Sequence, residues 1–292
     1  HFMLTLLLCV ILNSLIGVVF KLFDKYKIDN FQAIVVNYYI CVVTAGFTVM
    51  KNPIPDNLTE KPWFIYAILL GMVFIIVFNI MATTVQKSGV MIATIFQKIS
   101  LVAPALIAII WFGEKSGFMK WSGIICALIA IILLSYNKKT TNTDTTRPPD
   151  YLLFPMLTFL GSCLIDSAIY LIEKEGHVQN GDHEFVASLF LFAALTGTVL
   201  LTIQLITGKT KIALKNVLAG IGLGVPNFFS IYLLFLALQQ GLEGSVVFPV
   251  NNAGVLLLAS LYGIFIFRES VNLYKIGGFV LAVAAIIMIT FS

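Results

Sequence analysis

Ten apolar stretches follow one another along the chain, and short polar breaks separate them. A helix needs about 20 apolar residues to cross the hydrocarbon layer of a bilayer, so each stretch predicts one membrane-spanning helix. The predicted spans cover residues 3–22, 31–50, 63–85, 89–112, 118–136, 151–172, 185–207, 214–238, 244–267 and 271–291.

The composition agrees with a chain that lies in lipid. Of its 292 residues, 59% are hydrophobic and 11% are charged, and the mean hydropathy is +0.99. A soluble domain carries about 25% charged residues. We therefore expect an all-α, multi-pass protein of the inner (plasma) membrane, with the lipid bilayer as its first partner.

The charges and cysteines exclude several other classes of protein. The net charge of +4 comes from basic residues scattered between apolar runs, so we expect no nucleic-acid partner. The four cysteines lie inside apolar runs without a CxxC pair, which predicts neither a disulfide nor a metal site. No serine, histidine and aspartate gather at membrane depth, so an enzyme is not expected, and no cofactor is implied.

The chain divides into two similar halves. A polar linker at 137–150 separates residues 1–136 from residues 151–292, and each half holds five predicted spans. At an offset of 155 residues, Glu114 aligns with Glu269, and identical residues recur at 112/267, 120/275, 123/278 and 127/282. Five is an odd number, so two tandem copies enter the membrane in opposite directions. Such inverted repeats enclose a substrate site near the midplane of the bilayer in transporters.

Polar residues at helical spacing follow the first, third, fourth, sixth, eighth and ninth spans, whereas the fifth and tenth have almost none. One interpretation is that the six polar helices line a central cavity. The other is that the polar side chains join helices, at about 0.6 kcal/mol per hydrogen bond. For the whole pattern we favour the cavity. The candidate residues are Asn13, Asn79, Gln97, Lys98, Asp166, Tyr170, Asn251 and Asn252.

Lys98 lies in the middle of the fourth span, where a lysine costs about 2.5–3.5 kcal/mol on insertion scales. It can bind an anionic group of a substrate in the cavity, form a structural ion pair with Asp166, or extend to the membrane interface. The spans place Lys98 and Asp166 about 10 Å apart in depth, at 1.5 Å per residue. We therefore favour the cavity interpretation over the ion pair.

Asp166 and three prolines have two interpretations each. Asp166 either exchanges a coupling proton or cation, or holds a neighbouring helix through hydrogen bonds. Pro104, Pro226 and Pro249 lie inside spans, where each removes a backbone hydrogen bond. They are candidate hinges for gating, or static bends fixed by packing.

Two segments carry a resemblance to a known family: "SLVAPALIAIIWFGEK" at 100–115 and "NNAGVLLLASLYGIFIFRES" at 251–270. With ten spans in two halves, each with a glutamate before its last helix, the chain resembles the EamA-type branch of the drug/metabolite transporter superfamily. The resemblance implies a basket of ten helices around a central cavity. Four-span relatives couple protons to cationic drugs through a carboxylate in their first helix. Here the equivalent position, near Gly17, carries no carboxylate. The residue that aligns with Gly17 in the second half is Asp166.

From these observations we expect a secondary transporter that moves a small polar metabolite by alternating access, with an amino acid or another carboxylated metabolite favoured. Lys98 anchors the acidic group in this hypothesis. Gln97, Asn252, Asn251, Asn79 and Asn13 complete the hydrogen bonds, and Phe96 and Tyr170 shape the pocket.

Two alternatives stay open: a proton-coupled exporter of cationic drugs that uses Asp166, and a membrane scaffold or receptor without transport. The expected partners are a small-molecule substrate and the bilayer, with a coupling proton or counter-substrate left open. We expect a monomer or a weak homodimer.

Overall fold

The computed structural model describes residues 2–50, 52–113, 117–135, 152–178, 182–239 and 244–291. These residues form helices joined by short connections. The first half contains α1 (Phe2–Lys25), α2 (Asn30–Val49), the short 3₁₀ helix η1 (Leu58–Glu60), α3 (Phe64–Ser88), α4 (Val90–Ile99), α5 (Val102–Ile110) and α6 (Phe118–Ser135). The second half contains α7 (Leu153–Lys174), α8 (His183–Ile206), α9 (Leu214–Gln239), α10 (Gly244–Leu261), the π-helical turn η3 (Tyr262–Ile266) and α11 (Leu273–Thr290).

Within the described residues, the ten predicted spans are confirmed as ten helical segments in the expected order. The fourth span is broken, because α4 and α5 meet at a turn. The ninth ends in the π-helical turn η3. In the part of the chain that is described, eight segments are long and apolar enough to cross a membrane, and α6 and the end of α10 are shorter apolar helices.

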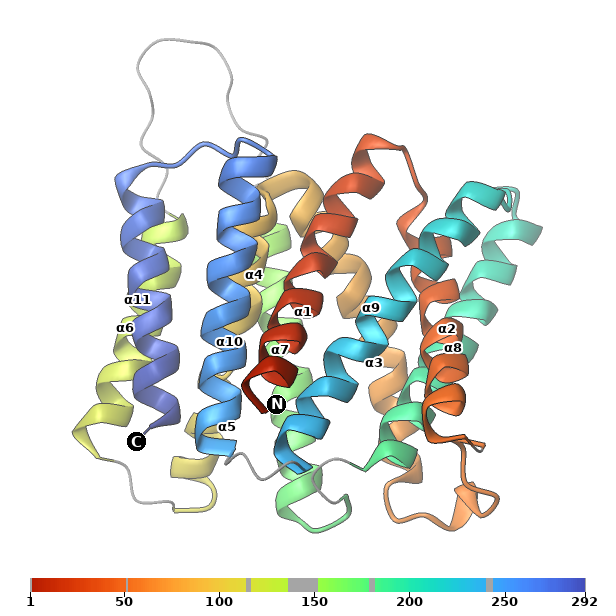
Figure 1. The fold of residues 1–292 in the computed structure, drawn as a ribbon, viewed down its shortest axis with the longest axis horizontal. Coiled ribbons are helices and arrows are strands. Elements are labelled where there is room, and N and C mark those ends of the chain that lie inside the picture. Colours follow the sequence, from red (N-terminus) through yellow and green to blue (C-terminus); the bar gives the residue numbers. More distant parts are fainter. Residues whose placement is uncertain are drawn as a thin grey trace.

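The most extensive helix–helix contacts recur when the two halves are exchanged. Helix α1 packs on α9 as α7 packs on α3, and α2 packs on α9 as α8 packs on α3. The equivalent helices α2 and α8, α4 and α10, and α6 and α11 pack on each other. In Figure 1, α6 and α11 form one edge of the molecule, and α2 and α8 form the opposite edge. The exchange agrees with an internal repeat, although the linker at 137–150 lies outside the described residues.

Aspartate side chains fix the starts of two equivalent helices. Asp29 accepts hydrogen bonds from the backbone N–H groups of Phe31 and Gln32 at the start of α2, at 3.0 and 3.2 Å. Asp182 accepts from the N–H groups of Glu184 and Phe185 at the start of α8, also at 3.0 and 3.2 Å. Both carboxylates satisfy donors that have no partner inside their helix.

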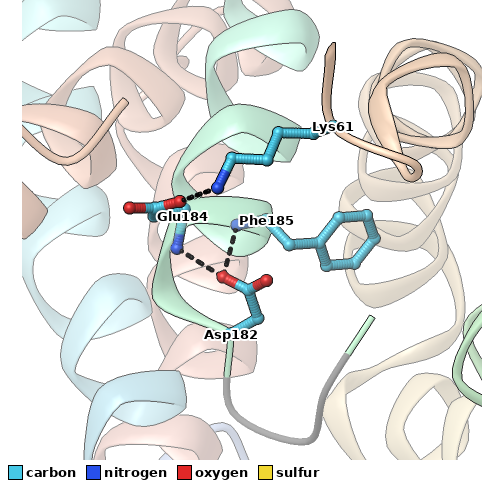
Figure 2. A network of polar contacts seen from close by, with 4 residues as sticks. All are labelled: Lys61, Asp182, Glu184 and Phe185. Carbon is cyan, nitrogen blue, oxygen red and sulfur yellow. Dashed lines mark hydrogen bonds and ion pairs between the residues drawn. The ribbon is translucent and has the colours of Figure 1, made fainter. Parts of the chain in front are cut away.

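An ion pair ties the connection before α3 to the start of α8. Lys61 Nζ lies 2.8 Å from Glu184 Oε2. Figure 2 shows this contact beside the Asp182 cap. The hydrogen bond to the Glu184 carboxylate raises the pKa of Lys61 above its ordinary value of 10.5. Trp63 follows closely and packs edge-on against Phe185, with 5.5 Å between ring centres.

This pair predicts a stability difference that depends on pH. A lysine pKa raised by folding gives its full stabilisation below the ordinary value of 10.5, and the stabilisation is lost as pH rises through the raised pKa. We expect Glu184→Gln to melt at a lower temperature than the wild type near neutral pH, and the difference to shrink above 10.5. Melting followed by tryptophan fluorescence measures it. A difference that grows with pH would contradict the assignment.

Candidate functional site

The break between α4 and α5 has a cause in the sequence. Pro104 has no N–H group, so it cannot donate to the carbonyl of Ser100 four residues earlier. The helix stops at Ile99 and restarts at Val102. The Ser100 carbonyl instead accepts a shorter-range hydrogen bond from the Ala103 N–H group at 2.9 Å. It also lies 3.8 Å from the Sγ atom of Cys163 on α7, which is placed to donate to it.

At this break the polar residues of α4 and α7 meet. The Ser100 hydroxyl contacts both the Gln97 carbonyl and the Oδ2 atom of Asp166. The contact places the Asp166 carboxylate within about one helical turn of Lys98 in depth. The predicted separation of about 10 Å in depth is therefore wrong, because the position of one helix relative to another across the membrane is not encoded in hydropathy.

Lys98 is half-buried although it lies in the middle of a span. Its charge is within electrostatic reach of Asp166 and of Cys9 on α1. Among the described residues it forms no hydrogen bond and no ion pair within 4.0 Å. Asp166 is also half-buried and is bonded to Ser100. Lys98 and Asp166 thus lie near each other without a direct ion pair.

A second polar group surrounds Cys9, which lies within electrostatic reach of Lys98. The Cys9 thiol is fully buried, 3.0 Å from the Ser230 carbonyl of α9 and 3.4 Å from the Asn251 Oδ1 atom of α10. Asn251 is also buried, with 4% of its surface exposed. Its neighbour Asn252 is half-buried, as are two other candidates, Gln97 on α4 and Asn13 on α1. The site thus draws on helices α1, α4, α7, α9 and α10.

The remaining aromatic and amide candidates lie differently. Phe96 is fully buried among apolar residues that include Ile124 of α6, so its side chain packs in the apolar core. Tyr170 lies one turn beyond Asp166 on α7, with its ring edge-on to Phe112 at 5.9 Å. Asn79 donates to the carbonyl of Ile75 in its own helix, at 2.8 Å.

Two of the three candidate hinges show no break in the backbone. Pro226 lies inside α9, which continues to Gln239. Pro249 lies inside α10, and its side chain is outside the part of the structure that is described. Only Pro104 coincides with an interruption.

Some polar side chains do join helices. Asn227 on α9 donates to Asn37 Oδ1 on α2 at 3.1 Å, and the Thr84 and Thr158 hydroxyls of α3 and α7 lie 2.7 Å apart. The sequence did not indicate Ser100 or Cys9 as candidate site residues. For Ser100 the available signal was its position four residues before Pro104, and for Cys9 there was no comparable signal.

Comparisons with known proteins cover nearly the whole chain. The pattern of the EamA-like transporter family matches residues 2–136 and 153–291. An uncharacterized protein of Haemophilus influenzae is 26% identical over 288 residues, which cover 96% of this chain and 95% of that protein. A crystal structure with 12% identity has a TM-score of 0.60, covering 98% of this chain and 96% of the other, and supports the fold alone.

The fold and the site define a multi-pass membrane protein in which Lys98 of the first half and Asp166 of the second lie half-buried inside long apolar helical segments. The chain belongs to the EamA-like transporter family, part of the drug/metabolite transporter superfamily. It is therefore a membrane transporter that takes a small-molecule substrate and sits in a lipid bilayer.

Proposed function

We propose that this transporter moves a small metabolite that carries a carboxylate, an amino acid above all, and that Lys98 anchors the carboxylate. The observation that carries the proposal is the state of Lys98. It lies deep in the bilayer and keeps accessible surface, yet has no bonded partner among the described residues. A charge in this position needs a counter-charge, because unpaired charges at membrane depth are costly. A substrate carboxylate supplies one.

Asp166 favours a zwitterion over a simple anion. Its carboxylate lies close to Lys98 in depth and keeps accessible surface beside Ser100. An α-amino acid carries an ammonium and a carboxylate a few ångströms apart, and it can place one on each of these residues. The cationic-drug alternative is less favoured, because the Lys98 charge lies within electrostatic reach of Asp166 and repels a cation there.

A ligand screen tests the proposal. Purified protein is heated with amino acids, organic acids without an amine, cationic drugs and phosphorylated metabolites. A ligand that binds only the folded state stabilises it by about 2.7 kcal/mol at a hundredfold excess over its Kd. We expect amino acids to raise the melting temperature of the wild type, but not of Lys98→Gln.

The control is Lys25→Gln, which removes an exposed lysine at the end of α1 and should leave the response intact. Stabilisation by cationic drugs alone, lost in Asp166→Asn and kept in Lys98→Gln, would contradict the proposal and support the drug exporter. A response to amino acids that Lys98→Gln retains would remove Lys98 as the anchor.

A further inference from the structure

The side chain of Glu269 lies at the start of α4, far along the chain from its own position. It follows the π-helical turn η3. Its Oε1 atom accepts a hydrogen bond from the Val90 N–H group at 2.6 Å, and Oε2 accepts from the Met91 N–H group at 3.3 Å. A carboxylate in this place accepts from two N–H groups that have no partner inside the helix, and the positive end of the helix dipole stabilises its negative charge.

The backbone around Glu269 leaves a slot for this carboxylate. A Cβ atom at Gly89 would lie 2.6 Å from Cδ of Glu269, and one at Gly263 would lie 2.6 Å from its Oε2. Both distances are shorter than real Cβ contacts, so a side chain at either position would displace the Glu269 carboxylate from the slot. The Glu269 N–H group donates to the Gly263 carbonyl at 2.9 Å. Arg268, just before it, takes a left-handed backbone with φ of 53°, which is uncommon for a residue with a side chain.

The helix that Glu269 holds is the one that carries Lys98. Helix α4 has ten residues and is separate from α5. At its start it is bound by Glu269, and at its end Ser100 is bound by Asp166. Two carboxylates from the second half of the chain therefore hold both ends of α4. A helix of this length has little stability of its own, so its position depends on these contacts and on packing.

We infer that Glu269 is a positioning residue, which holds α4 against η3 and thereby fixes where Lys98 and Gln97 point. An ordinary helix cap would act differently. Its loss would free only the N–H groups of Val90 and Met91 and would loosen no more than the first turn, residues 90–93. Loss of a positioning contact moves the whole of α4, including the turn that carries Lys98.

Hydrogen–deuterium exchange of the full chain in nanodiscs separates the two roles without any substrate, so the result is independent of the proposed function. We expect Glu269→Gln to raise exchange about tenfold or more in peptides covering 90–93 and also 94–99. Gly263→Ala should do the same while keeping the charge, because its Cβ displaces the carboxylate. Asp24→Asn, which neutralises an exposed acid at the end of α1, is the matched control and should match the wild type.

A second measurement follows Lys98 itself. Acetylation of each lysine by a small amine-reactive ester is quantified by mass spectrometry, with exposed Lys25 as the internal reference. We expect the ratio of Lys98 to Lys25 labelling to change at least threefold in Glu269→Gln, and to move back towards wild type in Glu269→Asp, which keeps the charge. Exchange confined to 90–93 with an unchanged labelling ratio would overturn the inference and leave Glu269 as a simple cap. A Glu269→Gln protein that does not fold leaves Gly263→Ala to decide by the same criteria.

Discussion

Gly220→Leu should prevent the protein from folding, whereas Gly222→Leu on the same helix should not. A Cβ at Gly220 would lie 2.5 Å from the carbonyl oxygen of Ala33 and 2.6 Å from Cβ of Val36, both on α2. A Cβ at Gly222 meets nothing within 4 Å. Overpacking a core costs about 1–3 kcal/mol or more. Here the clash is with backbone atoms and a Cβ atom, which cannot move to another rotamer. We expect a loss of at least about 3 kcal/mol for Gly220→Leu.

The measurement is the yield of monodisperse protein after detergent extraction, together with its melting temperature. The two variants add the same side chain two residues apart on α9, so differences in expression or hydrophobicity cancel. Equal yields and melting temperatures would show that α2 and α9 do not pack as closely as described.

Lys98→Gln should reduce transport of the amino acid found in the ligand screen by about 10- to 100-fold in proteoliposomes. The substitution keeps a polar side chain, one atom shorter, and removes the charge. A hydrogen bond to a charged group contributes about 1.5–3 kcal/mol, and each 1.4 kcal/mol is a factor of ten. Counterflow at a fixed internal substrate concentration measures KM, which we expect to rise, and the maximal rate.

Lys25→Gln, reconstituted to the same density, is the reference for this assay. Because Lys25 is exposed at the end of α1, its loss should change the rate by less than about twofold. A Lys98→Gln protein that transports at the wild-type rate would show that the lysine charge does not contact the substrate.

Hydropathy was sufficient for the fold because lipid is a uniform solvent. Each apolar run predicted one helix, and polar breaks such as "KYKIDN" predicted the starts of the next, where Asp29 caps α2. The break after Ile99 was not predicted, although Pro104 carried the signal for it. An apolar run has the same hydropathy whether or not its helix is interrupted.

The sequence singled out part of the candidate site, and the limit has a physical origin. Lys98 and Asp166 were chosen as candidates because a charge inside an apolar run is unusual, and their role stays a prediction. Their closeness in depth was not found, because it depends on how α7 is displaced along the membrane normal relative to α4. Glu269 served in the sequence only as a marker of the repeat, and its contact with Val90 bridges 179 residues.

The Ser100 hydroxyl lets Asp166 change its protonation state without losing a bond. When the carboxylate is ionised, the hydroxyl donates its single hydrogen to Asp166. The Gln97 carbonyl still accepts a hydrogen bond from the backbone N–H group of Ser100, with 3.3 Å between nitrogen and oxygen. When the carboxyl is protonated, it donates its own hydrogen to the hydroxyl oxygen, and the hydroxyl hydrogen turns to the Gln97 carbonyl. Rotation about one C–O bond thus keeps the hydrogen bond between Ser100 and Asp166 in either protonation state of the carboxyl group.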